Sequence, residues 1–241
     1  MEFNLLFLGE HESSQTDRIY HIANHTSSVA LITDFKNHYV LLDTGSVWAQ
    51  DKLLEKLKDL NVKPEQITHL ALTHGHLDHV GNIGLFKNAL VHIHACHMDS
   101  KTGLTSLYKD MHEKPLPFGI EVFPSRGHTY EHVSYFFEYE GLRYCFAGDA
   151  VRENHFTDKV PEYYSMERRL RYLDSARHIF ESCDVIIPGH FGVIEGEQKT
   201  FLYKNLLKQE EEILKRLSIY DKFKYRKLLK EIYYRRKFLQ N

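Results

Sequence analysis

The chain has 241 residues, of which 42% are hydrophobic and 27% charged, and its formal net charge is −2. This composition suits one large folded domain, or a domain with an appendage, and is unlike that of a disordered chain. The near-neutral charge points neither to nucleic acid nor to a membrane as a partner. Three scattered cysteines without a Cys-x-x-Cys pair argue against a disulfide framework and favour a reducing compartment. They are interpreted as small buried hydrophobic residues: Cys96, Cys145 and Cys183.

The N-terminus lacks the basic start and the long apolar stretch of a secretory signal peptide. No apolar run approaches the roughly 18 residues needed to cross a bilayer. We therefore expect a soluble, cytoplasmic protein that does not contact a membrane.

The first half of the chain is rich in short β-type runs. Two of them are joined by Phe35-Lys36-Asn37 and are predicted to form a hairpin. Regularly spaced leucines predict a helix after the turn at Asp43-Thr44-Gly45. The elements expected up to residue 94 are strands at 3–8, 28–34, 38–42, 67–73 and 90–94 and helices at 51–60 and 81–86.

The second half mixes strands and helices. A second hairpin is predicted around the turn Glu140-Gly141. Several histidines and aspartates directly follow predicted strands, where loops at one sheet edge meet in space. The elements expected here are strands at 120–123, 133–139, 142–147 and 185–187, a helix at 167–180, and irregular segments at 97–118 and 150–165.

The character of the chain changes from residue 198 onward. Residues 201–241 carry 12 Lys and Arg against five Asp and Glu, and contain no proline or glycine. One or two long amphipathic helices, broken near 218–221, are predicted, so the chain divides into a body at 1–197 and a basic helical extension at 198–241. The extension is interpreted as a solvated face that balances an acidic body. A homodimer contact and a nucleic-acid contact stay open as alternatives.

The segment Thr73–His79 places four metal-ligand side chains within six residues. At an extended strand end, positions i and i+2 share one side, so His74 and His76 are able to grip one metal. Asp78 and His79, after the turn, are able to reach a second metal. Nitrogen and carboxylate ligands suit zinc, and also iron or manganese.

The pattern His-x-His-x-Asp-His in this segment resembles the signature of the metallo-β-lactamase superfamily. Further elements of the family pattern follow in the expected order and cover roughly residues 3–195. The resemblance implies an αββα sandwich, with two mixed sheets face to face and the metal site at one edge between them. The matching elements are Leu42-Asp43-Thr44-Gly45, Gly127-His128-Thr129, Ala147-Gly148-Asp149 and Pro188-Gly189-His190.

The resemblance implies two divalent metal ions, zinc first, with iron or manganese as alternatives. Asp78 would lie near the attacking water and carry a proton to the leaving group. Asp43 would orient a ligand rather than bind metal. In the implied ligand set, His74, His76 and His128 hold the first metal, Asp78, His79 and His190 hold the second, and Asp149 bridges the two.

The implied reaction is hydrolysis of a small molecule by a hydroxide held between the two metals. An ester-type bond is expected, with a lactone or carboxylic ester preferred, because residues 148–161 resemble the same region of N-acyl homoserine lactone lactonases. Arg152 stands where those enzymes carry a substrate-binding tyrosine, which Tyr163 or Tyr164 would have to replace.

Other functions stay open for the same scaffold. They are a glyoxalase II-like thioesterase, a phosphodiesterase or nuclease, an iron-dependent persulfide dioxygenase, and a zinc-stabilised binding module without catalysis. The complete set of second-metal ligands favours hydrolysis. The remaining histidines near the motifs are expected to be supporting or surface groups, and replacing His132 with alanine is expected to change little: His92, His94, His97 and His132.

Overall fold

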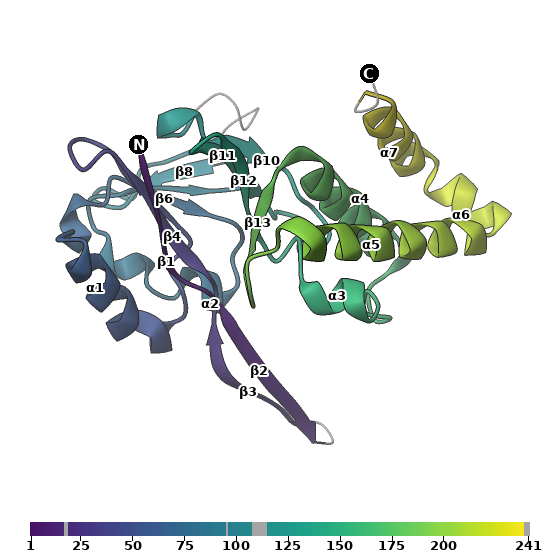
Figure 1. Cartoon of the computed structure of the whole chain (residues 1–241), viewed down its shortest axis with the longest axis horizontal. Coiled ribbons are helices and arrows are strands. Elements are labelled where there is room, and N and C mark those ends of the chain that lie inside the picture. Colours follow the sequence, from purple (N-terminus) through teal and green to yellow (C-terminus); the bar gives the residue numbers. More distant parts are fainter. Residues whose placement is uncertain (17–18, 95, 108–114, 239–241) are drawn as a thin grey trace.

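The structure is a computed structural model that describes residues 1–16, 19–94, 96–107 and 115–238. The described strands form a seven-stranded sheet, a four-stranded sheet and a separate two-stranded hairpin. The two larger sheets pack against each other, and helices cover their outer faces (Figure 1). This arrangement confirms the predicted αββα sandwich.

The larger sheet has the strand order β1-β4-β5-β6-β7-β8-β9. Strands β1, β4 and β5 are antiparallel, which confirms the predicted first hairpin, and β5, β6 and β7 run parallel. The strands are β1 (Glu2–Phe7), β4 (Val29–Thr33), β5 (Tyr39–Leu42), β6 (His69–Leu72), β7 (Leu90–Ile93), β8 (Cys96–Asp99) and β9 (Thr105–Leu107).

The smaller sheet has the order β10-β11-β12-β13, and only its last pair is parallel. Strands β11 and β12 are the predicted second hairpin. The strands are β10 (Glu121–Phe123), β11 (Ser134–Tyr139), β12 (Leu142–Gly148) and β13 (Val185–Pro188).

Alternation along the strands produces the layers of the sandwich. In β4, Ala30 and Ile32 pack with residues of the smaller sheet such as Tyr135, whereas Leu31 faces the other way and packs with Leu53 of α1. Successive side chains of a strand point to opposite faces, so one buried strand serves two core layers. A third layer lies between the smaller sheet and helices α4 and α5.

Helix α1 lies on the outer face of the larger sheet, and α4 and α5 lie on the outer face of the smaller sheet. Helix α5 shares a core layer with the smaller sheet, and Leu228 and Ile232 of α7 pack with Leu170 of α4. The helices are α1 (Gln50–Asp59), α2 (Leu77–Val80), α3 (Glu153–Thr157), α4 (Met166–Ser182), α5 (Gly196–Arg216), α6 (Ile219–Lys224) and α7 (Arg226–Phe238), with 3-10 turns at Val47–Ala49, Pro64–Gln66, Ile83–Leu85 and Pro117–Gly119.

The C-terminal extension is helical and breaks at Leu217 and Ser218, next to the predicted position, but its described part forms three helices rather than one or two, with a second break at Tyr225. Helix α5 ends at Arg216, and Ser218 then caps α6 by accepting a hydrogen bond from the backbone N–H of Asp221. The boundary predicted at residue 197 falls in the first turn of α5 and stays a prediction. No helix in the described part of the chain is both long and apolar enough to cross a membrane.

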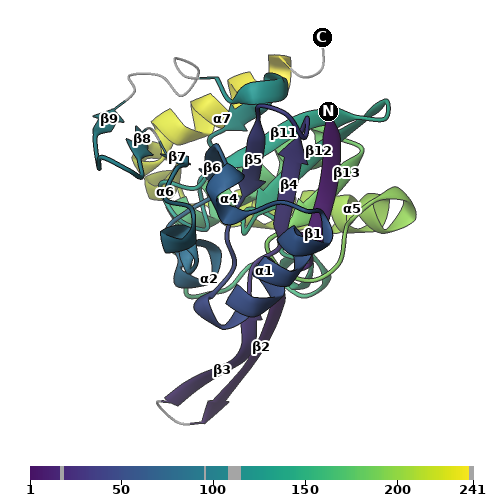
Figure 2. The same cartoon turned by 90° about the vertical axis from the view of Figure 1, so that its left-hand side faces the viewer.

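The hairpin of β2 (Glu10–Thr16) and β3 (Ile19–Thr26) was not predicted. It projects from the body of the sandwich (Figures 1 and 2). Its first strand reads Glu-His-Glu-Ser-Ser-Gln-Thr, which lacks the apolar alternation on which strand prediction depends.

Three other segments differ from the sequence prediction. The helix expected at 81–86 is replaced by α2, which starts earlier, and by a 3-10 turn. Strand β9 and all but the first residue of β8 lie in the segment 97–118 that was expected to be irregular, of which 108–114 lie outside the described residues. Helix α3 lies within the segment 150–165 that was expected to be a loop. These elements are short and their sequences have weak periodicity, so their secondary structure depends on contacts with neighbouring segments.

Candidate metal centre

The seven side chains predicted as metal ligands meet at one edge of the sandwich. His74, His76, Asp78 and His79 follow β6 of the larger sheet, whereas the other three follow strands of the smaller sheet or lie between them. His128 lies between β10 and β11, Asp149 directly follows β12, and His190 follows β13. Among the described residues they form two groups whose ligand atoms all lie within 4.8 Å of one another: His74, His76, His128 and Asp149, and Asp78, His79 and His190.

The first group brings three ring nitrogens and one carboxylate oxygen together. His76 Nδ1 lies 2.9 Å from His74 Nε2 and 3.0 Å from His128 Nε2. Asp149 Oδ2 lies 3.3 Å from His128 Nε2. Ligands at 2.0–2.1 Å from a tetrahedral zinc ion are separated by about 3.3 Å, so the group has the spacing of a coordination sphere.

The second group faces the other oxygen of the same aspartate. Asp149 Oδ1 lies 3.4 Å from both His79 Nε2 and His190 Nε2. Asp78 Oδ2 lies 3.1 Å from His190 Nε2 and 3.5 Å from His79 Nε2. Asp149 therefore directs one carboxylate oxygen at each group.

Two buried atoms of this centre show that the residues fit bound metal. His79 Nε2 and Asp149 Oδ1 are buried and have no hydrogen-bond partner among the described residues. A buried polar atom without a partner is costly, and a cation would satisfy both. The donors are imidazole nitrogens and carboxylate oxygens, which suit zinc, iron or manganese.

Asp43, which was predicted to orient a ligand, lies against His79. Its carboxylate accepts hydrogen bonds from the Thr73 backbone N–H at 2.7 Å and from the Thr73 hydroxyl at 2.9 Å. His79 Nδ1 lies 2.7 Å from Asp43 Oδ2, which leaves His79 Nε2 to face the second group. Asp43 itself has φ 54°, a left-handed conformation that aspartate tolerates better than most residues.

Glycines next to two of the candidate ligands leave the space in which the centre is built. Gly148 has φ 52°, and a Cβ there would lie 2.8 Å from the side chain of Thr73. A Cβ on Gly189 would lie 2.3 Å from Asp149 Oδ1 and 2.9 Å from His79 Cε1. Glycine at 189 therefore allows Asp149 and His79 to approach, and glycine at 148 allows the backbone before Asp149 to pass close to Thr73.

Comparison with known proteins identifies the family. The model of the metallo-beta-lactamase superfamily matches residues 22–190. The chain belongs to the metallo-beta-lactamase superfamily. It is 34% identical over 173 residues to metallo-beta-lactamase domain-containing protein 1 of Xenopus laevis, which covers 66% of this chain and 70% of that protein.

Two further similarities agree with this assignment to the metallo-beta-lactamase superfamily. A Methanocaldococcus jannaschii protein named "probable metallo-hydrolase" is 28% identical over 160 residues, which covers 66% of this chain and 74% of that one. A metallo-beta-lactamase family protein of Thermus thermophilus superposes with a TM-score of 0.59 at 18% identity, over 89% of this chain and 80% of that one, and supports the fold. The chain is therefore a metal-dependent hydrolase of the superfamily.

Burial and neighbouring carboxylates set the charge of the histidines in this candidate metal centre. Burial lowers the pKa of His74 well below its usual value and that of His128 to about 3, so both rings are neutral. Burial also opposes protonation of His79, but the carboxylates of Asp43 and Asp149 outweigh it and raise the pKa of His79 well above its usual value.

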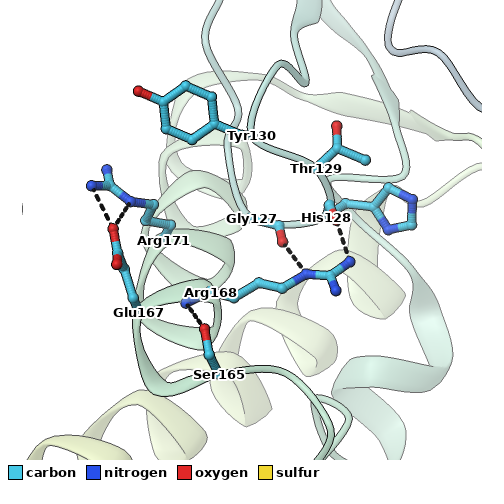
Figure 3. A pocket seen from close by; sticks show the side chains of 8 residues that line it. All are labelled: Gly127, His128, Thr129, Tyr130, Ser165, Glu167, Arg168 and Arg171. Atoms are coloured by element: carbon cyan, nitrogen blue, oxygen red, sulfur yellow. Dashed lines mark hydrogen bonds and ion pairs between the residues drawn. The ribbon is translucent and has the colours of Figure 1, made fainter.

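Arg168 and Tyr164 both contact the loop of His128, and Figure 3 shows the Arg168 guanidinium beside Gly127 and His128. Arg168 was not identified from the sequence, and Tyr164 was named there only as a possible substrate contact. The Arg168 guanidinium donates to the Gly127 carbonyl at 2.8 Å and to the His128 carbonyl, and it lies 3.6 Å from the centre of the Tyr164 ring. The Tyr164 hydroxyl lies 3.4 Å from His128 Nδ1. Tyr164 is thus buried against His128, whereas Tyr163 is exposed.

His132 is not a surface group, and we no longer expect its replacement with alanine to change little. It is fully buried, its Nε2 accepts the backbone N–H of Asp149 at 3.1 Å, and its Nδ1 lies 2.8 Å from Ser125 Oγ. His132 thus fixes the backbone of the residue that faces both groups. His94 is half-buried and lies 3.1 Å from the carbonyl oxygen of Glu131, as expected of a supporting group.

Two more residues lie next to the candidate ligands, and neither contact was predicted from the sequence. His25 Nε2 lies 2.6 Å from Asp78 Oδ2, and the Arg152 guanidinium lies 3.7 Å from Asp149 Oδ2. His25 comes from the unpredicted β2–β3 hairpin, so no local motif could reveal its contact.

Proposed function

We propose that the chain is a dinuclear metal-dependent hydrolase of ester-type bonds, with a lactone or a carboxylic ester as preferred substrate. The observation that carries this proposal is Asp149, whose Oδ2 faces the first ligand group and whose Oδ1 faces the second. A carboxylate with one oxygen toward each group is suited to hold two cations side by side. Because both groups are complete, hydrolysis is favoured over the single-iron oxygen chemistry of dioxygenases.

Two bound cations would supply a nucleophile from water and polarise the bond to be cleaved. The protein's own residues would then orient the substrate and handle a proton. Asp78 is the residue proposed to carry that proton to the leaving group. Burial opposes its ionisation, but hydrogen bonds from His190 and His25 hold the pKa of Asp78 below its usual value, so its carboxylate is ionised at neutral pH.

Arg152 is the residue proposed to bind the substrate. Its side chain is mostly buried, its Nε has no hydrogen-bond partner among the described residues, and its guanidinium lies 3.7 Å from Asp149. It lines a cavity of about 540 Å³ together with Lys159 and Tyr163. A guanidinium there is suited to hold a carbonyl or carboxylate oxygen of the substrate, the task that tyrosine performs in the lactonases.

A substrate panel tests the proposed function. The protein, loaded separately with zinc, manganese and iron, is assayed with p-nitrophenyl acetate, a homoserine lactone, a glutathione thioester and bis-p-nitrophenyl phosphate. We expect the ester or the lactone to be cleaved fastest, and to be cleaved at a greatly reduced rate by Asp149→Ala. Faster cleavage of the thioester or phosphodiester, or oxygen consumption with a persulfide, would contradict the proposal.

The role of Arg152 is tested on the same substrates. Arg152→Ala is expected to raise KM for the preferred substrate while the metal content stays at the wild-type level. Arg171→Ala is the matched control, because Arg171 pairs with Glu167 on the surface of α4. An unchanged KM in Arg152→Ala would show that this guanidinium does not bind substrate.

A further inference from the structure

The base of the β2–β3 hairpin places two histidines against the metal centre. His11 lies at the start of β2 and His25 near the end of β3. Their ring centroids are 4.6 Å apart, and they lie 5.2 Å and 5.5 Å from the ring centroid of His190. Figures 1 and 2 show the hairpin leaving the sandwich.

A β-bulge turns this part of the hairpin. Glu10 pairs with Thr26 and Glu12 with Ala23, so two steps along β2 match three steps along β3. Asn24 within the bulge has φ 46°. Bulges redirect side chains and are common next to functional sites, and here His25, which follows Asn24, contacts the carboxylate of Asp78.

Backbone hydrogen bonds fix the hairpin base to the loops of the second ligand group. The N–H of Ser27 donates to the carbonyl of Asp78 at 3.0 Å, and the N–H of Ser28 donates to the carbonyl of Gly189 at 2.7 Å. The N–H of Phe191 donates to the carbonyl of Gly9 at 2.9 Å. The two histidines are therefore held in place beside His190 by the same backbone that positions Asp78.

The three histidines have the composition and spacing of a metal site. One ligand atom from each of His11, His25 and His190 lies within 4.8 Å of the others. His190 Nε2 faces Asp78 and Asp149, while its Nδ1 is buried without a hydrogen-bond partner in the described part of the chain. Three imidazole nitrogens are a common donor set for zinc and other transition metals.

We propose that His11, His25 and His190 form an outer metal position through which the second cation of the centre is loaded. The inference rests on the proposed dinuclear function, because it concerns the cation held by Asp78, His79 and His190. A neutral imidazole has one free lone pair, so His190 serves one position at a time. In this proposal the cation first binds at the outer position and then moves to the inner position formed by Asp78, His79 and His190. Because His190 serves one position at a time, the chain holds no more than two cations.

The test is metal content after the inner position is removed. Apo protein is loaded with excess cobalt, freed of unbound metal by gel filtration, and analysed by inductively coupled plasma mass spectrometry and by visible absorption of cobalt. Wild type and His11→Ala are expected to hold two equivalents, and His79→Ala is expected to keep a second equivalent in the outer position. His79→Ala/His11→Ala is expected to hold one. His79→Ala/His38→Ala, which changes an exposed histidine of the β4–β5 turn, is the matched control and is expected to hold two.

The outcomes separate the two proposals. One equivalent in His79→Ala, or two in His79→Ala/His11→Ala, would overturn the outer position. Fewer than two equivalents in wild type would instead overturn the dinuclear function itself. If circular dichroism shows that His79→Ala is unfolded, the stopped-flow rate of cobalt uptake decides: His11→Ala is expected to slow uptake of the second equivalent several-fold and leave the first unchanged, and equal rates would overturn the proposal.

Discussion

The candidate ligands are themselves held by side chains that do not face either group. Asp43 fixes the ring of His79, and Tyr164 and Arg168 fix His128. Such partners set the orientation and basicity of a ligand, so their loss weakens metal binding without removing any ligand. We therefore expect metal affinity to depend on individual supporting residues as well as on the ligands themselves.

Arg168 gives the most direct test of this support. Arg168→Ala removes the hydrogen bonds to the carbonyls of Gly127 and His128, and we expect zinc affinity of the first group to fall roughly 10–100-fold. Competition with a chromophoric chelator measures the affinity. Arg171→Ala, on the same helix and in the same cavity, is expected to bind as wild type (Figure 3). Equal affinities in the two variants would show that Arg168 does not support His128.

His132 is expected to matter for stability as well as for metal. His132→Ala leaves the buried N–H of Asp149 without its acceptor, which costs about 1–3 kcal/mol. Urea unfolding of the apo protein should therefore show a lower midpoint, and zinc content should fall. His94→Ala, at a half-buried histidine outside both groups, serves as the control and is expected to unfold like wild type; a similar loss in both variants would remove the special role of His132.

The two groups are expected to release metal at different pH. The pKa of His79 is raised, so a cation entering the second group must displace a proton, and its affinity falls about tenfold for each pH unit below that pKa. The pKa values of His74 and His128 are lowered, so the first group has no proton to displace until more acidic pH. Stepwise dialysis from pH 8 to pH 5 should show His76→Ala, which keeps the second group, losing its cation at higher pH than His190→Ala. The reverse order would contradict this account.

At the scale of elements, strong periodicity predicted structure and weak periodicity did not. Helix α1 places Leu53 and Leu57 on one face, so its leucine spacing predicted it, whereas β4 was predicted as a short run of β-type residues that is buried throughout. The β2–β3 hairpin has a polar sequence and is fixed by backbone bonds to Asp78 and Gly189, which no sequence pattern shows.

The residues of the candidate site could also be predicted only where a local sequence pattern marks them. The ligand motifs could be recognised because each is a short pattern at a strand end. The supports could not be predicted, because Arg168 lies 40 residues from His128 and His25 lies 53 residues from Asp78 along the chain. Contacts of that kind depend on how the two sheets and the hairpin come together.

Helix α5 is expected to stabilise the sandwich rather than to act as a free tail. Leu206 is fully buried in the layer between the smaller sheet and α5, so Leu206→Ala should lower the free energy of unfolding by about 2–5 kcal/mol. Guanidinium unfolding followed by circular dichroism measures this. Phe201→Ala, at an exposed position of the same helix, should change little. A negligible effect of Leu206→Ala would mean that the extension folds apart from the body.

At the scale of the whole molecule, the centre joins the two sheets. The larger sheet supplies His74, His76, Asp78 and His79 at the end of β6, and the smaller sheet supplies Asp149 and His190 at the ends of β12 and β13. Each ligand group therefore contains residues from both sheets. Bound metal is expected to hold the sheets together, since any ligand that binds only the folded state stabilises it.

The most direct measurement is the metal content of zinc-loaded wild type beside Asp149→Ala, determined by mass spectrometry on protein freed of unbound metal. Because Asp149 directs one oxygen at each group, we predict two zinc ions per chain in wild type and at most one in the variant. A single ion in wild type, or two retained in Asp149→Ala, would contradict the account.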